Sequence, residues 1–277
     1  MALALGIIGY GTMGSAIGEQ LKARYPIYAF DKEPLRFKNI EGITVTKNLE
    51  QIFSSCTTVF LAVKPQDFES LLSEIKDLVR GQLLVSIAAG VSTRYIENRI
   101  RQVRVIRVMP NLAITVAAGM SCLTKGSNAS NVDLSFIQGI FNRLGKTLLI
   151  EERMMNQATA VSGSGPGFFF DLIRFLPKDR WREFGFEQFL PALEQAASKL
   201  GFGLINAKLL SEATVEGSLS LLDKAHKSPE ILCMRVASRG GTTEAGLKVL
   251  SGDIKNLEKA VMAAKKRADE LSSNFVN

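Results

Sequence analysis

Cysteine, histidine and tryptophan are scarce in this sequence of 277 residues, and long apolar runs are missing from it. The three cysteines, Cys56, Cys122 and Cys233, are odd in number and far apart along the chain. This spacing excludes a disulfide framework and a zinc site, so we expect no bound metal and a reducing compartment, the cytoplasm. No apolar run reaches the ~20 residues that a membrane helix needs, so no membrane association is expected.

The single histidine, His226, stands shortly before Pro229 in a predicted loop. A solvent-exposed side chain is expected there rather than a catalytic imidazole. The acid–base chemistry of this protein should therefore not depend on histidine.

Charge, by contrast, is plentiful, with a formal net charge of +7. The basic residues are interleaved with apolar or acidic ones, and the longest run, Lys265–Arg267, is expected to be a solvated helix face. A nucleic-acid partner is therefore not expected, whereas an anionic cofactor and an anionic substrate would be attracted.

Short β-branched runs alternate with helical stretches through the first half of the chain. The predicted strands are Leu5–Ile8, Ile27–Phe30, Thr58–Val63, Leu83–Ile87 and Val103–Val108, followed by Gly119–Leu123 and Lys146–Ile150 around a predicted helix, Val132–Leu144. Such alternation requires crossover connections and predicts an α/β fold with a Rossmann-type, doubly wound, mostly parallel sheet. The apolar opening stretch Ala2–Ile8 lacks a preceding basic residue, so we expect a buried strand rather than a signal peptide.

Strand signals nearly vanish after Glu151, and amphipathic helical patterns replace them. The longest patterns are Phe189–Leu200, Lys208–Leu222 and Asp253–Leu271. We therefore predict an α/β domain over residues 1–155 and an all-α domain over residues 156–277. The charged segment Pro177–Pro191 is predicted to be an inserted loop or a short helix.

A glycine pattern, Gly9-Tyr10-Gly11-Thr12-Met13-Gly14, follows the first predicted strand and opens a predicted helix. In dinucleotide-binding folds such glycines serve the tight turn, the approach to the pyrophosphate and close helix packing. Asp31 follows about 20 residues later at the end of the second strand, where an acid bonds the adenosine ribose. This context predicts a dinucleotide site.

The choice of cofactor stays open between NADPH and NADH. Asp31 favours NADH, whereas the cations Lys32 and Arg36 favour the 2′-phosphate of NADPH. Ala62-Val63-Lys64-Pro65 and Ala88-Ala89-Gly90 end two further strands at the edge where open α/β sheets bind ligands. We predict that they line the same site, although ordinary turns would also place them there.

Several segments occur in the order found in pyrroline-5-carboxylate reductases, a family that the chain resembles over nearly its whole length. They are Gly9–Gly14, Ala62–Pro65, Ser86–Val91, Arg107–Asn111, Gly163–Pro166 and Ser238–Gly246. The resemblance implies NAD(P)H-dependent reduction of the ring C=N bond of 1-pyrroline-5-carboxylate to L-proline. It also implies a homodimer or larger homo-oligomer, with residues 1–155 binding the cofactor and residues 156–277 serving dimerisation and substrate binding.

The resemblance further implies roles for two groups of residues. A cyclic imino acid would be bound by Ser238, Gly240, Gly241, Thr242 and Thr243, with Thr243 as the catalytic residue, and the nicotinamide would be bordered by Met109, Pro110 and Asn111. Independently of the family, a Gly-Gly turn entering a helix exposes backbone N–H groups suited to a carboxylate. An ordinary helix N-cap remains the alternative for this turn.

The sequence departs from the family pattern close to the implied substrate site. Leu112 and Ala113 stand where Thr-Pro is usual, Gly167 and Phe168 where Ala-Tyr is usual, Arg239 replaces a proline, and Met234 replaces an acid. Arg239 would add a cation for a second carboxylate, or would be a surface replacement. A reductase of another cyclic imine or carbonyl compound therefore stays open as an alternative.

Two more distant alternatives are a non-catalytic dinucleotide-binding protein and a β-hydroxyacid dehydrogenase. The first has no need of the turn Gly240–Thr243, which is retained here. The second resembles this pattern but requires a lysine on the first long helix of its second domain, and Phe168–Leu176 contains none.

Overall fold

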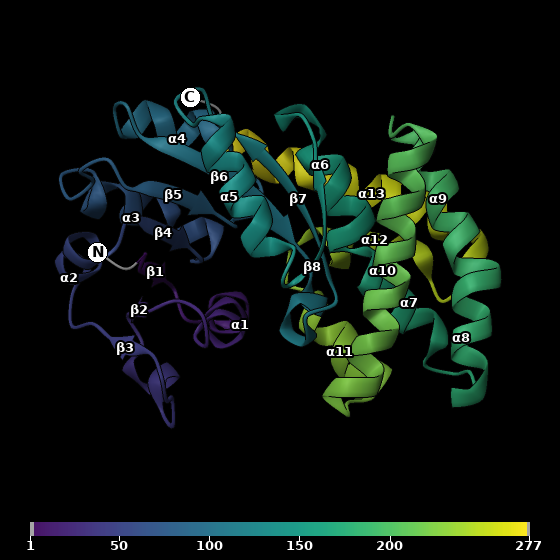
Figure 1. Cartoon of the computed structure of the whole chain (residues 1–277). Coiled ribbons are helices and arrows are strands. Elements are labelled where there is room, and N and C mark those ends of the chain that lie inside the picture. Colours follow the sequence, from purple (N-terminus) through teal and green to yellow (C-terminus); the bar gives the residue numbers. More distant parts are fainter. Residues whose placement is uncertain (1–2, 276–277) are drawn as a thin grey trace. The chain divides into compact units, whose positions relative to one another are not determined.

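The computed structural model describes residues 3–275, and these contain an eight-stranded sheet of order β3-β2-β1-β4-β5-β6-β7-β8 (Figure 1). The strands are β1 (Leu5–Ile8), β2 (Ile27–Phe30), β3 (Thr44–Val45), β4 (Thr58–Leu61), β5 (Leu83–Ser86), β6 (Arg104–Pro110), β7 (Gly119–Lys125) and β8 (Gly145–Leu149). Neighbouring strands from β3 to β6 are parallel. Because β2 and β4 flank β1 on opposite sides, the sheet is doubly wound, which confirms the predicted Rossmann-type fold.

The central strands β1, β4 and β5 are buried over their full length. A parallel sheet is covered by crossover helices on both faces, so its strands need apolar side chains on both sides. Ile7, Phe60 and Val85 are accordingly fully buried. The first strand is thus buried as predicted, although Ala2 lies outside the described residues.

The last strands form an antiparallel edge. Asn111 N donates to Met120 O at 3.1 Å, and Gly126 N donates to Val105 O at 2.8 Å. The partners run in opposite directions along β6 and β7, as in an antiparallel pair. The two late strand candidates are therefore confirmed, whereas the short exposed strand β3 was not predicted.

The described chain divides into two compact units. The first comprises residues 3–108, 123–140 and 275, and the second comprises residues 109–122 and 141–274. The helices of the first unit are α1 (Thr12–Leu21), α2 (Leu49–Ser55), α3 (Phe68–Ile75), α4 (Thr93–Arg99) and, except for its last residue, α5 (Asn131–Phe141). A core that includes Ile52, Phe68 and Leu84 joins α2, α3 and α4 to the sheet.

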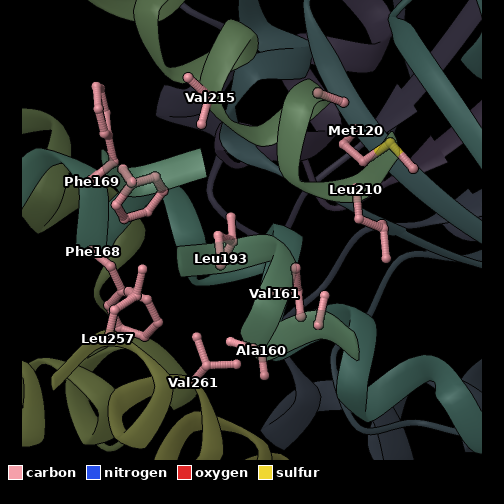
Figure 2. Close-up of a cluster of buried hydrophobic side chains, with 14 of the residues drawn as sticks. Met120, Ala160, Val161, Phe168, Phe169, Leu193, Leu210, Val215, Leu257 and Val261 are labelled. Carbon is pink, nitrogen blue, oxygen red and sulfur yellow. The ribbon is translucent and has the colours of Figure 1, made fainter. Parts of the chain in front are cut away.

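The second unit is mainly helical, as predicted for the C-terminal region. Its main helices are α6 (Met155–Ala158), α7 (Gly165–Ile173), α8 (Trp181–Phe184), α9 (Leu190–Lys199), α10 (Leu204–Ala225), α11 (Pro229–Val236), α12 (Thr242–Leu250) and α13 (Leu257–Ser272). Figure 2 shows fully buried side chains of its core, among them Phe169, Leu193, Val215 and Val261 from four different helices. Within residues 3–275 no helix is both long and apolar enough to span a membrane.

The charged segment Pro177–Pro191 is helical, one of the two structures predicted for it. The short helices η6 (Lys178–Arg180) and α8 and the π-helical turn η7 (Gly185–Phe189) run directly into α9. The Trp181 indole N–H donates to Leu176 O at 3.0 Å, and Phe189 is fully buried. The segment therefore extends the helical core instead of forming a loop.

Gly246 allows α12 to pack closely within the second unit. A Cβ atom at this position would lie 2.3 Å from Cζ of Phe168 and 2.8 Å from the carbonyl oxygen of Ala260. Gly246→Ala should therefore lower the free energy of unfolding by about 1–3 kcal/mol, measured by chemical denaturation.

Gly139, within α5, provides the matched control, because a Cβ atom there would meet nothing within 4 Å. Gly139→Ala should raise the free energy of unfolding by about 0.5–1 kcal/mol, since alanine has less backbone freedom to lose. Equal stability of the Gly246→Ala variant and the wild type would refute the packing role of Gly246.

Candidate cofactor and substrate sites

The glycine turn between β1 and α1 has a shape that only glycine allows. Gly9 has a φ of +93°, and a Cβ atom there would lie 2.7 Å from the carbonyl carbon and oxygen of Ala62. A Cβ atom on Gly14 would lie 2.0 Å from Gly9 O. These clashes explain why the chain holds glycine at both positions.

The N-terminus of α1 offers free backbone N–H groups. Its N-cap residue, Gly11, makes no side-chain hydrogen bond to the helix, and the first turn carries no acidic residue. Thr12 is exposed and Met13 half-buried, so the positive end of the helix dipole is open to an anion. The N-terminus of α1 therefore fits the pyrophosphate of a dinucleotide.

Asp31 is held firmly at the end of β2. Its carboxylate accepts hydrogen bonds from Tyr10 N at 2.6 Å and from Glu33 N at 2.8 Å. Arg36 Nε lies 3.4 Å from the same carboxylate, and Arg36 Nη2 lies 3.1 Å from the carboxylate of Glu33. The hydrogen bond to Glu33 raises the pKa of Arg36, so its guanidinium stays charged.

Of the two cations near Asp31, Arg36 rather than Lys32 faces the glycine turn. Arg36 Nη1 is 3.1 Å from the position of a Cβ atom on Gly11. Lys32 instead donates to the carboxylate of Glu74 in α3 at 2.9 Å. The sequence indicated both Lys32 and Arg36 as cations near the adenosine ribose, and of the two only Arg36 lies beside the glycine turn.

Replacing Arg36 by alanine should raise the KM for NADPH about tenfold relative to that for NADH, because a charged hydrogen bond to the 2′-phosphate would be lost. Lys32→Ala should change this ratio little, because Glu74 holds Lys32 against α3, whereas Arg36 lies beside Gly11. Steady-state kinetics with both cofactors measures the ratio. An equal rise in the KM for NADPH and the KM for NADH would contradict this role for Arg36.

The other predicted cofactor residues of the first unit follow β4 and β5. Ala62 N donates to Ile8 O at 2.8 Å, which fixes the segment Ala62–Pro65 beside the glycine turn. Lys64 is exposed, and the short helix η2 (Pro65–Asp67) begins at the next residue. Ala88–Gly90 continues from β5, where Gly90 has a φ of +80°. Both segments stand at the carboxyl edge of the sheet, as predicted.

At the end of β6, Asn111 has a structural task within the second unit. Its side-chain Oδ1 accepts hydrogen bonds from the backbone N–H groups of Ala113 and Met120, and its Nδ2 donates to Ser162 O. Asn111 is only 2% exposed. Its amide is therefore engaged by the protein, whereas the neighbouring Met109 is partly exposed and lies beside Gly163.

The signature turn before α12 brings Ser238 and Gly241 together. Gly241 N donates to Ser238 O at 2.9 Å, and a Cβ atom on Gly241 would lie 2.3 Å from the Ser238 hydroxyl. Gly240 has a φ of +70°, and its carbonyl oxygen accepts a hydrogen bond from Arg267 Nε at 2.8 Å. No side chain caps α12. The N–H of Gly240 donates to the carboxylate of Glu244 in the first turn of α12, whereas the first N–H groups of the helix itself are open to a carboxylate.

Three hydroxyl groups meet where α12 crosses the start of α7. Thr243 Oγ1 donates to Ser164 Oγ at 3.1 Å, and Ser164 Oγ lies 3.0 Å from Thr242 Oγ1. Ser164 is fully buried and Thr243 is 4% exposed. The structure thus joins two predicted substrate residues to Ser164, which sequence reasoning quoted within a motif but gave no role.

Other residues singled out in the sequence have no contact that assigns them to these sites. His226 ends α10 and is exposed, as predicted. Arg239 is exposed and Met234 is 68% exposed. The three cysteines are free, and burial raises the pKa of Cys56 to about 12, so that thiol is not a nucleophile at neutral pH. Within residues 3–275 no cluster of side chains suited to a metal ion is found.

Comparisons with known proteins find matches to both the cofactor half and the helical half of the chain. A family model described as NADP oxidoreductase coenzyme F420-dependent matches residues 4–90. A second model, described as pyrroline-5-carboxylate reductase dimerisation, matches residues 184–271. Together they cover parts of both compact units.

Individual relatives match along almost the whole chain. The pyrroline-5-carboxylate reductase of Methanosarcina acetivorans is 32% identical over 96% of this chain and 97% of its own. That of Aquifex aeolicus is 30% identical over 90% of this chain and 89% of its own.

Solved structures give the same result. The pyrroline-5-carboxylate reductase of Coxiella burnetii has a TM-score of 0.64 and 30% identity, covering 98% of this chain and 99% of its own. The pyrroline carboxylate reductase of Plasmodium falciparum, solved with NADP bound, has a TM-score of 0.63 and 25% identity, covering 98% of both chains. With the glycine turn and the signature turn both in place, the chain belongs to the pyrroline-5-carboxylate reductase family.

Proposed function

We propose that the protein catalyses the NAD(P)H-dependent reduction of 1-pyrroline-5-carboxylate to L-proline, the last step of proline biosynthesis. The observation that carries the proposal is the signature turn Ser238–Thr243, which ends in an uncapped helix N-terminus. This turn occurs in a chain that is 30% or more identical to reductases of that name over most of its length.

The cofactor, NADPH or NADH, supplies the hydride, and residues of the first unit bind its pyrophosphate and adenosine ribose. In this proposal the pyrophosphate lies on the N-terminus of α1 and the adenosine ribose lies beside Asp31. The remaining cofactor contacts come from Arg36, Ala62–Pro65 and Ala88–Gly90, with Met109, Pro110 and Asn111 bordering the nicotinamide.

The substrate is a small cyclic imino acid bound by the second unit. Its carboxylate lies against the turn that comprises Ser238, Gly240, Gly241 and Thr242, where the Ser238 hydroxyl and the first N–H groups of α12 are the donors. Its ring nitrogen lies against Thr243. A cyclic imine is readily protonated and is then already electrophilic, so the reaction needs orientation more than a strong protein acid. The exposed position of the only histidine, His226, is consistent with this.

The match of residues 184–271 to a dimerisation model supports assembly into a homo-oligomer. We propose a homodimer in which residues 156–277 provide the dimerisation and substrate domain, and residues 1–155 the cofactor domain. The protein would act in the cytoplasm, without a membrane or nucleic-acid partner.

The test follows the loss of NADH or NADPH absorbance by the purified protein, with and without 1-pyrroline-5-carboxylate. Oxidation that depends on the imine is expected, with a preference between the two cofactors. Cofactor binding without any such oxidation would reject this substrate, and a screen of other cyclic imines and carbonyl compounds would then follow.

A further inference from the structure

The hydroxyl of Ser164 contacts both threonines of the signature turn, although the proposed reaction gives Ser164 no role. Ser164 lies between the π-helical turn η5 (Thr159–Gly163) and α7, and its backbone N donates to Thr159 O at 2.8 Å. The next residues allow close packing, because a Cβ atom on Gly167 would lie 2.5 Å from the methyl group of Thr243. Ser164 is therefore fixed beside the start of α12.

The hydrogen bonds of this group run in one direction. Thr243 uses its only hydroxyl hydrogen to donate to Ser164. Ser164 has one hydrogen to donate in turn, and within residues 3–275 its hydroxyl has only one other partner, Thr242. Ser164 is fully buried, where a hydroxyl hydrogen without an acceptor is costly, so the arrangement in which Ser164 donates to Thr242 is the favoured one. Thr243 is left with free lone pairs, and Thr242, which is only half-buried, is left with a free hydrogen.

This arrangement of one acceptor and one donor matches the hydrogen-bonding groups of a protonated cyclic imino acid. The ring N–H of such a molecule is a donor and needs an acceptor, which Thr243 supplies. Its carboxylate is an acceptor and needs donors, which Thr242 supplies together with the N–H groups of the turn. A ligand with an acceptor atom in place of the ring N–H could not form this hydrogen bond, because its own lone pairs would face those of Thr243.

We propose that Ser164 is a positioning residue that makes Thr243 an acceptor and Thr242 a donor, and thereby selects the protonated form of a cyclic imino acid. The proposal rests on the proposed function, since it assumes that these threonines face the substrate. Ser164 itself acts only through the two threonines.

The test compares two ligands of nearly the same shape, L-proline and its ring-oxygen isostere tetrahydrofuran-2-carboxylate, as competitive inhibitors of imine reduction. In Ser164→Ala, Thr243 is free to turn its hydrogen toward the ring atom. The preference for L-proline over the isostere should therefore fall about tenfold from its wild-type value, while the KM for NAD(P)H stays the same.

Ser218→Ala is the matched control, because Ser218 is also fully buried, and within residues 3–275 its hydroxyl bonds only to Thr214 O of its own helix. A merely structural role for Ser164 would weaken both ligands equally, and an unchanged preference in Ser164→Ala would overturn the proposal. Ser164→Cys, which keeps the volume with a weaker donor, should shift the preference in the same direction by less. It provides the same test if the alanine variant does not fold.

Turnover of the imine by the wild type distinguishes a failure of the positioning role of Ser164 from a failure of the proposed function. Imine-dependent turnover by the wild type, with an unchanged ligand preference in both Ser164 variants, overturns the positioning role alone. A wild type that binds NAD(P)H but does not reduce the imine overturns the proposed function, and the positioning role with it.

Discussion

Gly14→Ala is expected to weaken NAD(P)H binding about a hundredfold. The added Cβ atom would lie 2.0 Å from Gly9 O and 3.1 Å from Gly9 C, both backbone atoms of the turn. The turn has little freedom to yield, because Gly9 N is bonded to Phe30 O at 2.8 Å and Gly9 contacts the backbone of Ala62. The N–H groups of α1 would thus be displaced from the pyrophosphate. Fluorescence titration with NADH and NADPH measures the loss.

Ser15→Ala is the control for this experiment. Ser15 lies one residue further along α1 and is half-buried, and its hydroxyl donates to Thr12 O at 3.3 Å. Its removal should leave both dissociation constants within about twofold of the wild-type values. Wild-type affinity in the Gly14→Ala variant would exclude the glycine turn as the pyrophosphate site.

Thr243→Val should lower kcat/KM for 1-pyrroline-5-carboxylate about a hundredfold and leave the affinity for NAD(P)H nearly unchanged. Valine keeps the branched shape that packs against Gly167, so the loss reports on the hydroxyl rather than on packing. Oγ1 is the one atom of the Thr243 side chain that can accept a hydrogen bond from the ring nitrogen. Steady-state kinetics, with imine and cofactor varied separately, gives both constants.

Thr214→Val is the matched control, since Thr214 is fully buried in α10 and its hydroxyl bonds to Leu210 O at 2.7 Å. Both variants lose a buried threonine hydroxyl, and only Thr243 is assigned to the substrate. Equal kcat/KM values for Thr243→Val and the wild type would refute the catalytic role of Thr243.

The sheet could be predicted because its central strands are buried on both faces and therefore carry unbroken apolar runs. β1, β2, β4 and β5 begin where they were predicted to begin. β3 escaped prediction because Thr44 and Val45 are both exposed and too few to show a pattern. The segment before α9 was ambiguous because Gly185 and Pro191 are typical of loops, yet Gly185 packs beside Phe169 and Pro191 lies in the first turn of α9.

The candidate sites could be predicted only where function imposes a local pattern. The glycine turn and the signature turn are such patterns, because each requires glycine at fixed spacing. The contact of Ser164 with Thr243 joins residues 79 positions apart and leaves no local trace. In the same way, Arg36 rather than Lys32 faces the glycine turn because the carboxylate of Glu74, far away in the sequence, binds Lys32.

The most direct test of imine reduction uses NAD(P)H carrying deuterium at the transferred position of the nicotinamide. The purified protein is incubated with this cofactor and 1-pyrroline-5-carboxylate, and the product is analysed by mass spectrometry and NMR. Hydride transfer to the ring C=N bond predicts L-proline with one deuterium, on the ring carbon next to nitrogen that carries no carboxylate. Oxidised cofactor without deuterated proline would contradict that reaction.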